Sequence, residues 1–155
     1  MMQSDQHNQS MLAQVAQAVT AIPFNRMLGL TLDHLSATDV EMHFKMKEDL
    51  IGNIFHGILH GGVTSAVLDM AGGMVVMAAS AVRLSERSVE EQIAIMSKTS
   101  TVDLQVSYLR PGKGETFIAK AYLLKSGHHL AFARMELWNQ DQILLATGTG
   151  TYALR

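Results

Sequence analysis

A long apolar stretch in the first half of the chain limits the possible folds more than any other feature. Between Leu50 and Val82 the only charged residue is Asp69, although 17% of the whole chain is charged. A segment this apolar belongs in a protein core or in a membrane. An ionised carboxylate in such surroundings is costly unless it has a partner. Asp69 is therefore the first candidate functional residue.

A membrane span is one explanation of this stretch. The run from Ile58 to Val82 is long enough, but it contains His60, Asp69 and four glycines. An aspartate at the centre of a membrane helix costs about 2.5–3.5 kcal/mol on insertion. We therefore expect a buried core helix and no membrane span.

The composition narrows the class of protein. With 155 residues, 48% of them hydrophobic, the chain has enough apolar side chains for one well-packed domain. A net charge of −2 gives no basic field for nucleic acid. The absence of cysteine excludes disulfides, thiolate metal sites and a cysteine nucleophile. The first residues lack the pattern of a signal peptide, so a cytoplasmic location is expected.

The order of expected elements favours the α+β class. A helix over 9–22, ended by Pro23, precedes the apolar stretch, whose helix runs from Gly61 to about Ser80. Leu50–Leu59 is expected to be a loop, and a short helix follows the capping-box pattern at Ser88. The expected strands are Met27–Leu35, Thr38–Met46, Thr101–Leu109, Glu115–Lys125, His128–Trp138 and Gln142–Ala153. We predict an N-terminal helix, residues 1–24, packed on a single domain, residues 25–155.

Two glycine pairs mark the predicted central helix. Gly72 and Gly73 indicate close packing against a sheet or another helix, because glycine weakens an exposed helix. Gly61 and Gly62 open the helix, where unpaired N–H groups form a ready oxyanion site. Asp69 follows Gly61 by eight residues, which is roughly 12 Å along the axis. If both act on one carbonyl group, a second chain must supply one of them, so the spacing indicates a dimer with shared sites.

These motifs together resemble a known family. The segment His60-Gly61-Gly62 is followed by Asp69, and the strand Thr101 to Tyr108 leads into Arg110-Pro111. With the closing strands around Gly127-His128 and Ala146 to Tyr152, the pattern resembles the acyl-CoA thioesterases of the hotdog fold, in particular the phenylacetate-pathway-like branch. The resemblance covers roughly residues 25–153.

The resemblance implies an antiparallel sheet wrapped around a long helix. Two protomers would form a continuous sheet, often pairing again into a tetramer, with active sites at the dimer interface. The substrate would be an acyl-CoA, hydrolysed without a metal or a redox cofactor.

The resemblance also implies roles for individual residues. Asp69 would be the general base or the nucleophile, the Gly61 N–H would polarise the thioester carbonyl, and His60 would assist. Asn53 would position the water or the carboxylate, and Thr101 would lie near the attacking water.

Four further residues are expected to bind substrate, namely Gly62, His56, Gly127 and His128. In relatives the asparagine usually precedes the histidine by six residues, whereas Asn53 precedes His60 by seven. His56 is therefore an alternative for the role of Asn53.

Other features leave alternatives open. The methionines at 70, 74 and 77 form a helical stripe that is either core or part of an acyl pocket, and aliphatic residues near the helix favour a medium to long chain. The segment 85–99 is expected to form a lid or one wall of that pocket. Arg110, Lys113 and Lys125 are candidates for contact with the phosphates of coenzyme A.

Two other functions compete with hydrolysis. A non-catalytic hotdog module would bind acyl-CoA without needing Asp69. A hydratase would need a histidine a few residues after the acid, and no histidine follows Asp69 within the helix. A metal site is not expected, because His56, His128 and His129 do not have ligand spacing on a shared helix face.

Overall fold

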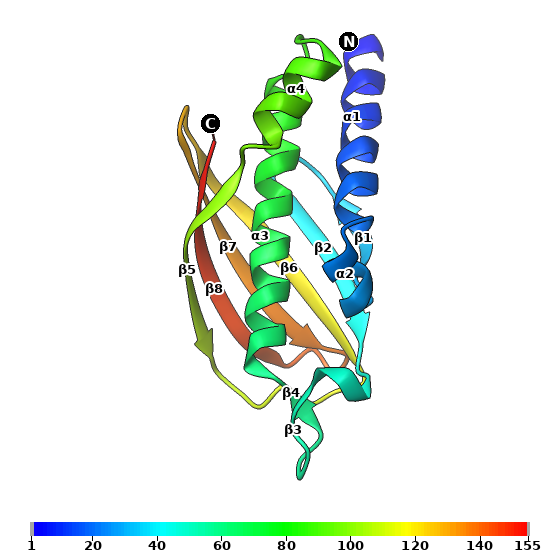
Figure 1. Ribbon diagram of the computed structural model, residues 1–155, viewed down its shortest axis with the longest axis vertical. Coiled ribbons are helices and arrows are strands. Elements are labelled where there is room, and N and C mark those ends of the chain that lie inside the picture. Colours follow the sequence, from blue (N-terminus) through cyan, green and yellow to red (C-terminus); the bar gives the residue numbers. More distant parts are fainter. Residues whose placement is uncertain (1, 155) are drawn as a thin grey trace.

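One antiparallel sheet curves around one long helix (Figure 1). The computed structural model describes residues 2–154 and the side chains of residues 9–154. The strands lie in the spatial order β1 (Thr31–Leu35), β2 (Asp39–Lys45), β6 (Thr116–Ser126), β7 (Leu130–Asn139), β8 (Leu144–Ala153) and β5 (Ser100–Tyr108). β1 and β5 are thus the two edges of the sheet, and the predicted α+β class is confirmed.

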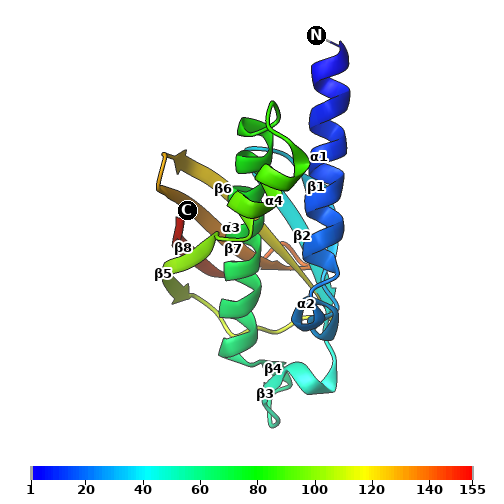
Figure 2. The ribbon, with the colours of Figure 1, turned by 45° about the horizontal axis from the view of Figure 1, so that its top comes forward.

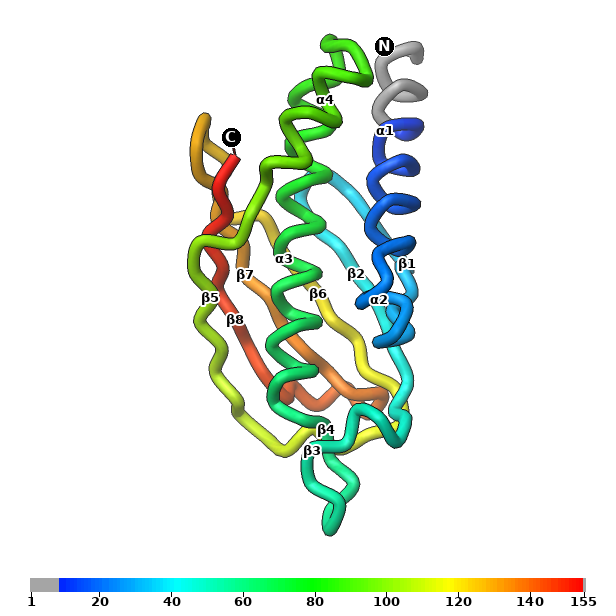
Figure 3. Tube along the Cα trace, in the orientation of Figure 1, coloured from blue at the N-terminus to red at the C-terminus, as the bar shows by residue number. Residues whose placement is uncertain are grey.

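The apolar stretch forms α3 (Gly61–Arg83), which lies across the inner face of the sheet and contacts β6, β7 and β8 (Figures 1 and 2). α1 (Met2–Thr20) packs beside α3 and contacts β1. α4 (Val89–Met96) begins with the capping box that Ser88 predicted, and the chain then enters β5 at the open edge (Figure 3).

By length and composition alone, α3 is the one helix in residues 2–154 that qualifies as a membrane span. In its most apolar 18-residue window, 56% of the residues are buried inside the protein. Its apolar side chains therefore have the sheet and α1 as partners, as in a core helix.

The predicted strand Met27–Leu35 is wrong in its first half. α2 (Pro23–Leu28) occupies that region, and β1 begins only at Thr31. Proline fits the first position of a helix, so Pro23 starts α2 as well as stopping the helix before it. Gly29 then ends α2 in the left-handed conformation with φ of 73°.

The predicted loop Leu50–Leu59 is also more regular than expected. A 3-10 turn, η1 (Glu48–Leu50), leads into a small hairpin of β3 (Ile51–Asn53) and β4 (Ile58–Leu59). A Cβ atom at Gly52 would lie 2.4 Å from the Cα of His60. Glycine at 52 therefore lets the hairpin lie directly against the residue that precedes α3.

The alternation predicted in β2 is confirmed. Val40, Met42 and Phe44 are buried, and the side chains between them face outward. Phe44 stacks on Phe117 of β6 with ring centroids 5.1 Å apart. Full burial of each such side chain contributes about 1.5–3 kcal/mol, which fixes the register of β2 beside β6.

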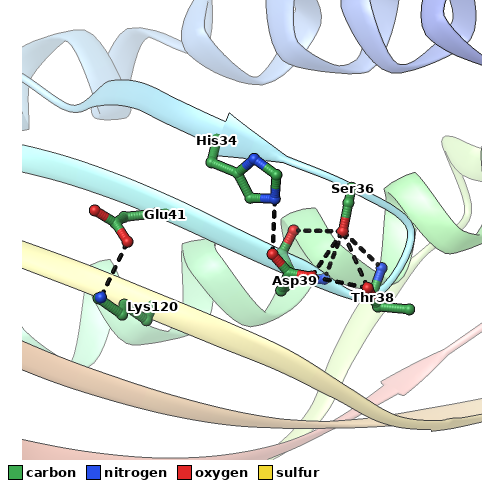
Figure 4. Close-up of polar contacts among 6 residues, drawn as sticks. All are labelled: His34, Ser36, Thr38, Asp39, Glu41 and Lys120. Carbon is green, nitrogen blue, oxygen red and sulfur yellow. Dashed lines mark hydrogen bonds and ion pairs between the residues drawn. The ribbon is translucent and has the colours of Figure 1, made fainter.

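A polar network holds the turn between β1 and β2 (Figure 4). The Asp39 carboxylate accepts hydrogen bonds from Thr38 and Ser36 and pairs with His34. The hydrogen bond from Thr38, followed by that from Ser36, lowers the pKa of Asp39. This turn adjoins the edge strand β1, at the opposite edge of the sheet from β5. Its charged side chains therefore stabilise the β1–β2 hairpin.

Candidate active site

The start of α3 is organised by His60, which is the N-cap residue of the helix. Its ring nitrogen Nδ1 accepts a hydrogen bond of 2.9 Å from the Gly62 N–H. A neutral imidazole that accepts at Nδ1 carries its proton on Nε2. A Cβ atom at Gly62 would lie 2.9 Å from Nδ1, so glycine makes this cap possible. The exposed Nε2–H remains the free donor of the ring.

The cap leaves the Gly61 N–H as a donor without an acceptor among the described residues. Tyr108 of β5 lies beside it and donates a 2.8 Å hydrogen bond to the Gly61 carbonyl oxygen. Both residues line a cleft of about 370 Å³, together with Arg110 and Leu145. The positive end of the helix dipole therefore faces an open cleft, as an oxyanion site requires.

Asp69 is held by two hydroxyl groups from the sheet. Thr101 donates to both carboxylate oxygens, at 3.0 Å to Oδ1 and 3.2 Å to Oδ2. Tyr152 lies 3.3 Å from Oδ1 and 3.1 Å from the backbone oxygen of Asp69. The half-buried carboxylate thus has the partners that its apolar surroundings demand. Both donors fix the orientation of a group that can still meet solvent.

The sheet register explains why these donors meet. Thr101 of β5 and Tyr152 of β8 are direct cross-strand partners, so their side chains leave the sheet on the same face. The register shifts between Thr101 and Asp103, which is a β-bulge at Val102. Bulges re-aim side chains and are common beside active sites.

Tyr152 reaches Asp69 only because side chains are missing around it. Tyr152 is 1% exposed. A Cβ atom at Gly72 would lie 2.2 Å from the Tyr152 hydroxyl, and one at Gly150 would lie 2.7 Å from it. The close packing predicted for Gly72 is confirmed, and its partner is this ring. Burial, followed by the negative charge of Asp69, raises the pKa of Tyr152 above its ordinary value.

This raised pKa predicts a loss of stability at alkaline pH. The folded protein holds the Tyr152 proton more tightly than the unfolded chain, so the stabilisation is complete below a pH of about 10 and falls as the pH rises further. The Tyr152→Phe variant is expected to show a smaller loss of unfolding free energy between pH 9 and 11.5 in urea titrations. Tyr122→Phe, on the outer face of the sheet, is the control. Equal slopes for wild type and Tyr152→Phe would contradict the assignment.

The other predicted residues fall into two groups. Asn53 and His56 lie in the β3–β4 hairpin at the start of α3, where Asn53 Oδ1 accepts from the Phe55 N–H at 3.0 Å. Gly127 and His128 lie in the β6–β7 turn at the opposite end of α3. Asn53 and His56 therefore lie on the hairpin that leads directly into His60, whereas Gly127 and His128 lie far from His60.

Sequence reasoning missed Tyr152, Tyr108 and Gly52. The flanking glycines of β8 were a signal for Tyr152, since a strand glycine marks a close approach.

The described residues contain no group of three or more His, Asp or Glu side chains that could hold a metal ion.

Sequence comparison identifies the class of protein. The sequence model of the thioesterase superfamily matches residues 56–146. The chain belongs to the thioesterase superfamily, and its antiparallel sheet around α3 is the hotdog fold.

Individual relatives extend this similarity beyond the matched segment. Medium/long-chain acyl-CoA thioesterase YigI of Escherichia coli (strain K12) is 40% identical over 131 residues, which are 84% of each chain. Acyl-coenzyme A thioesterase 13 of Homo sapiens is 31% identical over 132 residues, which are 83% of each chain. A crystal structure from Shewanella oneidensis, described as related to the thioesterase superfamily, has a TM-score of 0.90 and 36% identity. That comparison covers 96% of this chain and 97% of the other.

Proposed function

We propose that the protein hydrolyses acyl-CoA thioesters to a free acid and coenzyme A. One observation carries the proposal: the sheet holds the Asp69 carboxylate in a fixed orientation through Thr101 and Tyr152. A binding module would not need an oriented acid in an apolar helix. The named activities of the two acyl-CoA thioesterase relatives support the same reaction class.

In the proposed reaction, a water molecule adds its oxygen to the thioester carbonyl carbon and gives a proton to Asp69. In the alternative, Asp69 itself attacks that carbon, and after the thiolate leaves, water hydrolyses the resulting mixed anhydride to the free acid and restores the Asp69 carboxylate. The Gly61 N–H stabilises the oxyanion that forms, and the His60 Nε2–H assists. The carbon–sulfur bond then breaks and the thiolate takes a proton. Every step uses protein groups and water, so the proposal needs no metal and no redox cofactor.

The site requires two chains in this proposal. α3 is continuous from Gly61 to Arg83, so Gly61 and Asp69 of one chain stay roughly 12 Å apart. The edge strand β5 is exposed, and Val102 and Tyr108 on it are 60% and 56% exposed. An apolar open edge is a template for pairing with another chain. A homodimer joined at β5, alone or as a dimer of dimers, would bring the two halves together.

An apolar pocket supports a medium to long aliphatic acyl chain. Met77 of α3 lines a cavity of about 330 Å³ between α1 and α4. Its other lining residues are mainly apolar, including Val15, Ile93 and Met96. Met74 is fully buried in the core, so the methionine stripe contributes both to core packing and to this pocket. Met77 follows Asp69 by roughly 12 Å along α3, a span of roughly ten carbons with bonds of about 1.5 Å.

A thiol-release assay over straight-chain acyl-CoAs from two to eighteen carbons tests the function. We expect turnover that rises from short chains to an optimum at medium or long chains. Benzoyl-CoA and phenylacetyl-CoA serve as aromatic comparisons and should be poorer substrates. Tight binding of acyl-CoA with no thiol release at any length would instead identify a binding module.

A further inference from the structure

The wall of the apolar cavity between α1 and α4 contains one buried polar side chain, that of Gln92 on α4. Gln92 is 1% exposed and lines the cavity together with the apolar residues Met11, Val15 and Met77. Figure 1 shows α1 and α4 beside the far half of α3, at the opposite end from the β3–β4 hairpin. A buried amide in an apolar wall is costly unless both of its ends are hydrogen-bonded.

Only one end of this amide has a partner among the described residues. Gln92 Nε2 donates a hydrogen bond of 2.9 Å to the Arg87 carbonyl oxygen. Because a carbonyl oxygen can only accept, this bond fixes which end of the amide is the nitrogen. The other end, Oε1, is buried and accepts no hydrogen bond from the described part of the chain. The cavity wall therefore contains an acceptor that lacks a donor.

The other polar residues of the wall do not supply that donor. The Ser97 hydroxyl group donates to the Ala94 carbonyl oxygen at 3.1 Å. Gln14 of α1 is exposed, so its amide can bond to water. Within residues 9–154, no charged residue and no histidine lines the cavity. A hydroxyl group on the bound acyl chain fits this acceptor, since it donates one hydrogen bond and brings no charge into an apolar wall.

A purely structural role accounts for only half of the Gln92 side chain. The bond from Nε2 to Arg87 ties α4 to the connection that precedes it, and it leaves the buried oxygen unexplained. Asn25 Oδ1 and Ser80 Oγ are also buried without a partner among the described residues, but neither residue lines this cavity. Gln92 therefore combines an unpaired buried acceptor with a place in the wall of the acyl pocket.

The position of the cavity sets the place of the hydroxyl group on the acyl chain. Met77 lines the same cavity as Gln92 and follows Asp69 by roughly 12 Å along α3. A chain that starts from a thioester beside Asp69 reaches the cavity after roughly ten carbons. Val89 and Ile93, exposed apolar residues of α4, also line the cavity and would be covered by the entering chain.

We infer that the protein selects acyl-CoA thioesters whose chain carries a hydroxyl group roughly ten or more carbons from the thioester, and that Gln92 Oε1 accepts its hydrogen bond. The inference rests on the proposed function and deepens it, because it names the substrate class that the acyl pocket selects. A hydroxyl group entering the pocket gives up a hydrogen bond to water and regains one at Oε1. In a wholly apolar pocket the same group would lose that bond without replacement.

Paired substrates test this inference by thiol release from the wild-type protein. Acyl-CoAs of ten, twelve and fourteen carbons with a terminal hydroxyl group are compared with terminally fluorinated chains of the same lengths. Fluorine is close in size to a hydroxyl group but donates no hydrogen bond, and an apolar wall alone would favour it. We expect kcat/KM to be about tenfold higher for the hydroxylated chain at the length that reaches Gln92. Equal values, or a preference for fluorine, at all three lengths overturn the inference.

Gln92→Leu removes the acceptor and nearly preserves the size of the side chain. We expect this variant to lose the preference for the hydroxylated chain. The variant also loses the bond to Arg87, but a loosened α4 would affect both substrates alike and leave their ratio unchanged. Gln14→Leu, the same substitution at an exposed position of the same cavity, is the matched control and should keep the wild-type ratio. A wild-type ratio in Gln92→Leu contradicts the inference.

A binding measurement separates this inference from the proposed function. The same pairs of acyl-CoAs are titrated calorimetrically into Asp69→Asn, in which turnover is suppressed. The hydroxylated chain should bind about tenfold more tightly than the fluorinated one, and Asp69→Asn/Gln92→Leu should not distinguish them in this way. Equal dissociation constants in Asp69→Asn overturn the role of Gln92 even if hydrolysis is normal. Failure of the proposed function would appear instead as absent thiol release from every acyl-CoA in wild type.

Discussion

Asp69→Asn is expected to lower kcat by about 10²–10⁴-fold, the usual contribution of a positioned acid–base group. Asparagine keeps the size of the side chain and an oxygen that can accept from Thr101 and Tyr152. It can neither take a proton from water nor attack the thioester. Because the hydrogen bonds survive, folding and oligomeric state should not change. Steady-state thiol release from decanoyl-CoA measures the effect.

Asp33→Asn is the matched control for this variant. Asp33 lies on β1, at the opposite edge of the sheet from β5, and its side chain is exposed. Its neutralisation should leave kcat within about twofold, since an exposed charge contributes little. Wild-type turnover by Asp69→Asn would remove Asp69 from the mechanism.

Gly61→Pro is expected to lower kcat by about 10²–10³-fold, as loss of one oxyanion donor does. Proline has no N–H and is well tolerated at the first position of a helix. His60 before it has φ of −63° and ψ of 135°, a conformation that suits a residue preceding proline. The variant therefore removes the donor and keeps α3.

Gly61→Ala separates the lost N–H from the added bulk. A Cβ atom at 61 would lie 3.5 Å from the Tyr108 ring, which is ordinary contact. Alanine keeps the N–H and should retain most of the activity. If alanine and proline reduced kcat equally, the N–H at 61 would not be the donor.

Mixing the two inactive variants reports whether the site is shared. A heterodimer of Asp69→Asn and Gly61→Pro chains has one site with both defects and one with neither, if each site uses both chains. Random exchange of subunits should then restore about a quarter of the wild-type activity. A site built within one chain would keep a defect in every copy, and mixing would restore nothing.

The local patterns of the sequence predicted the elements that depend on neighbouring residues. The apolar run gave α3, the alternation at Val40 to Phe44 gave β2, and the Ser88 capping box gave α4. The start of β1 was misplaced because Pro23 can stop one helix and begin the next. Asp69 stood out through its isolation from other charges.

The partners of Asp69 depend on contacts that no local pattern contains. Tyr152 lies 83 positions from Asp69 in the chain, and the two meet only through the register of β5 on β8 and the packing of α3. Thr101 was predicted through family resemblance, because a threonine in a strand has many possible roles. The cavity at the far end of α3 likewise joins residues from α3, the α3–α4 connection and the β6–β7 turn.

The packing of the Tyr152 ring has a further consequence for how the protein loses activity as it unfolds. The side chains that hold Asp69 come from the sheet and not from its own helix. The hydrogen bond from Tyr152 forms only while the Tyr152 ring is packed closely between α3 and the sheet. A state with intact helices and strands but loosened packing would release the carboxylate into water. The catalytic activity thus depends on tertiary packing, and it is lost before the secondary structure unfolds.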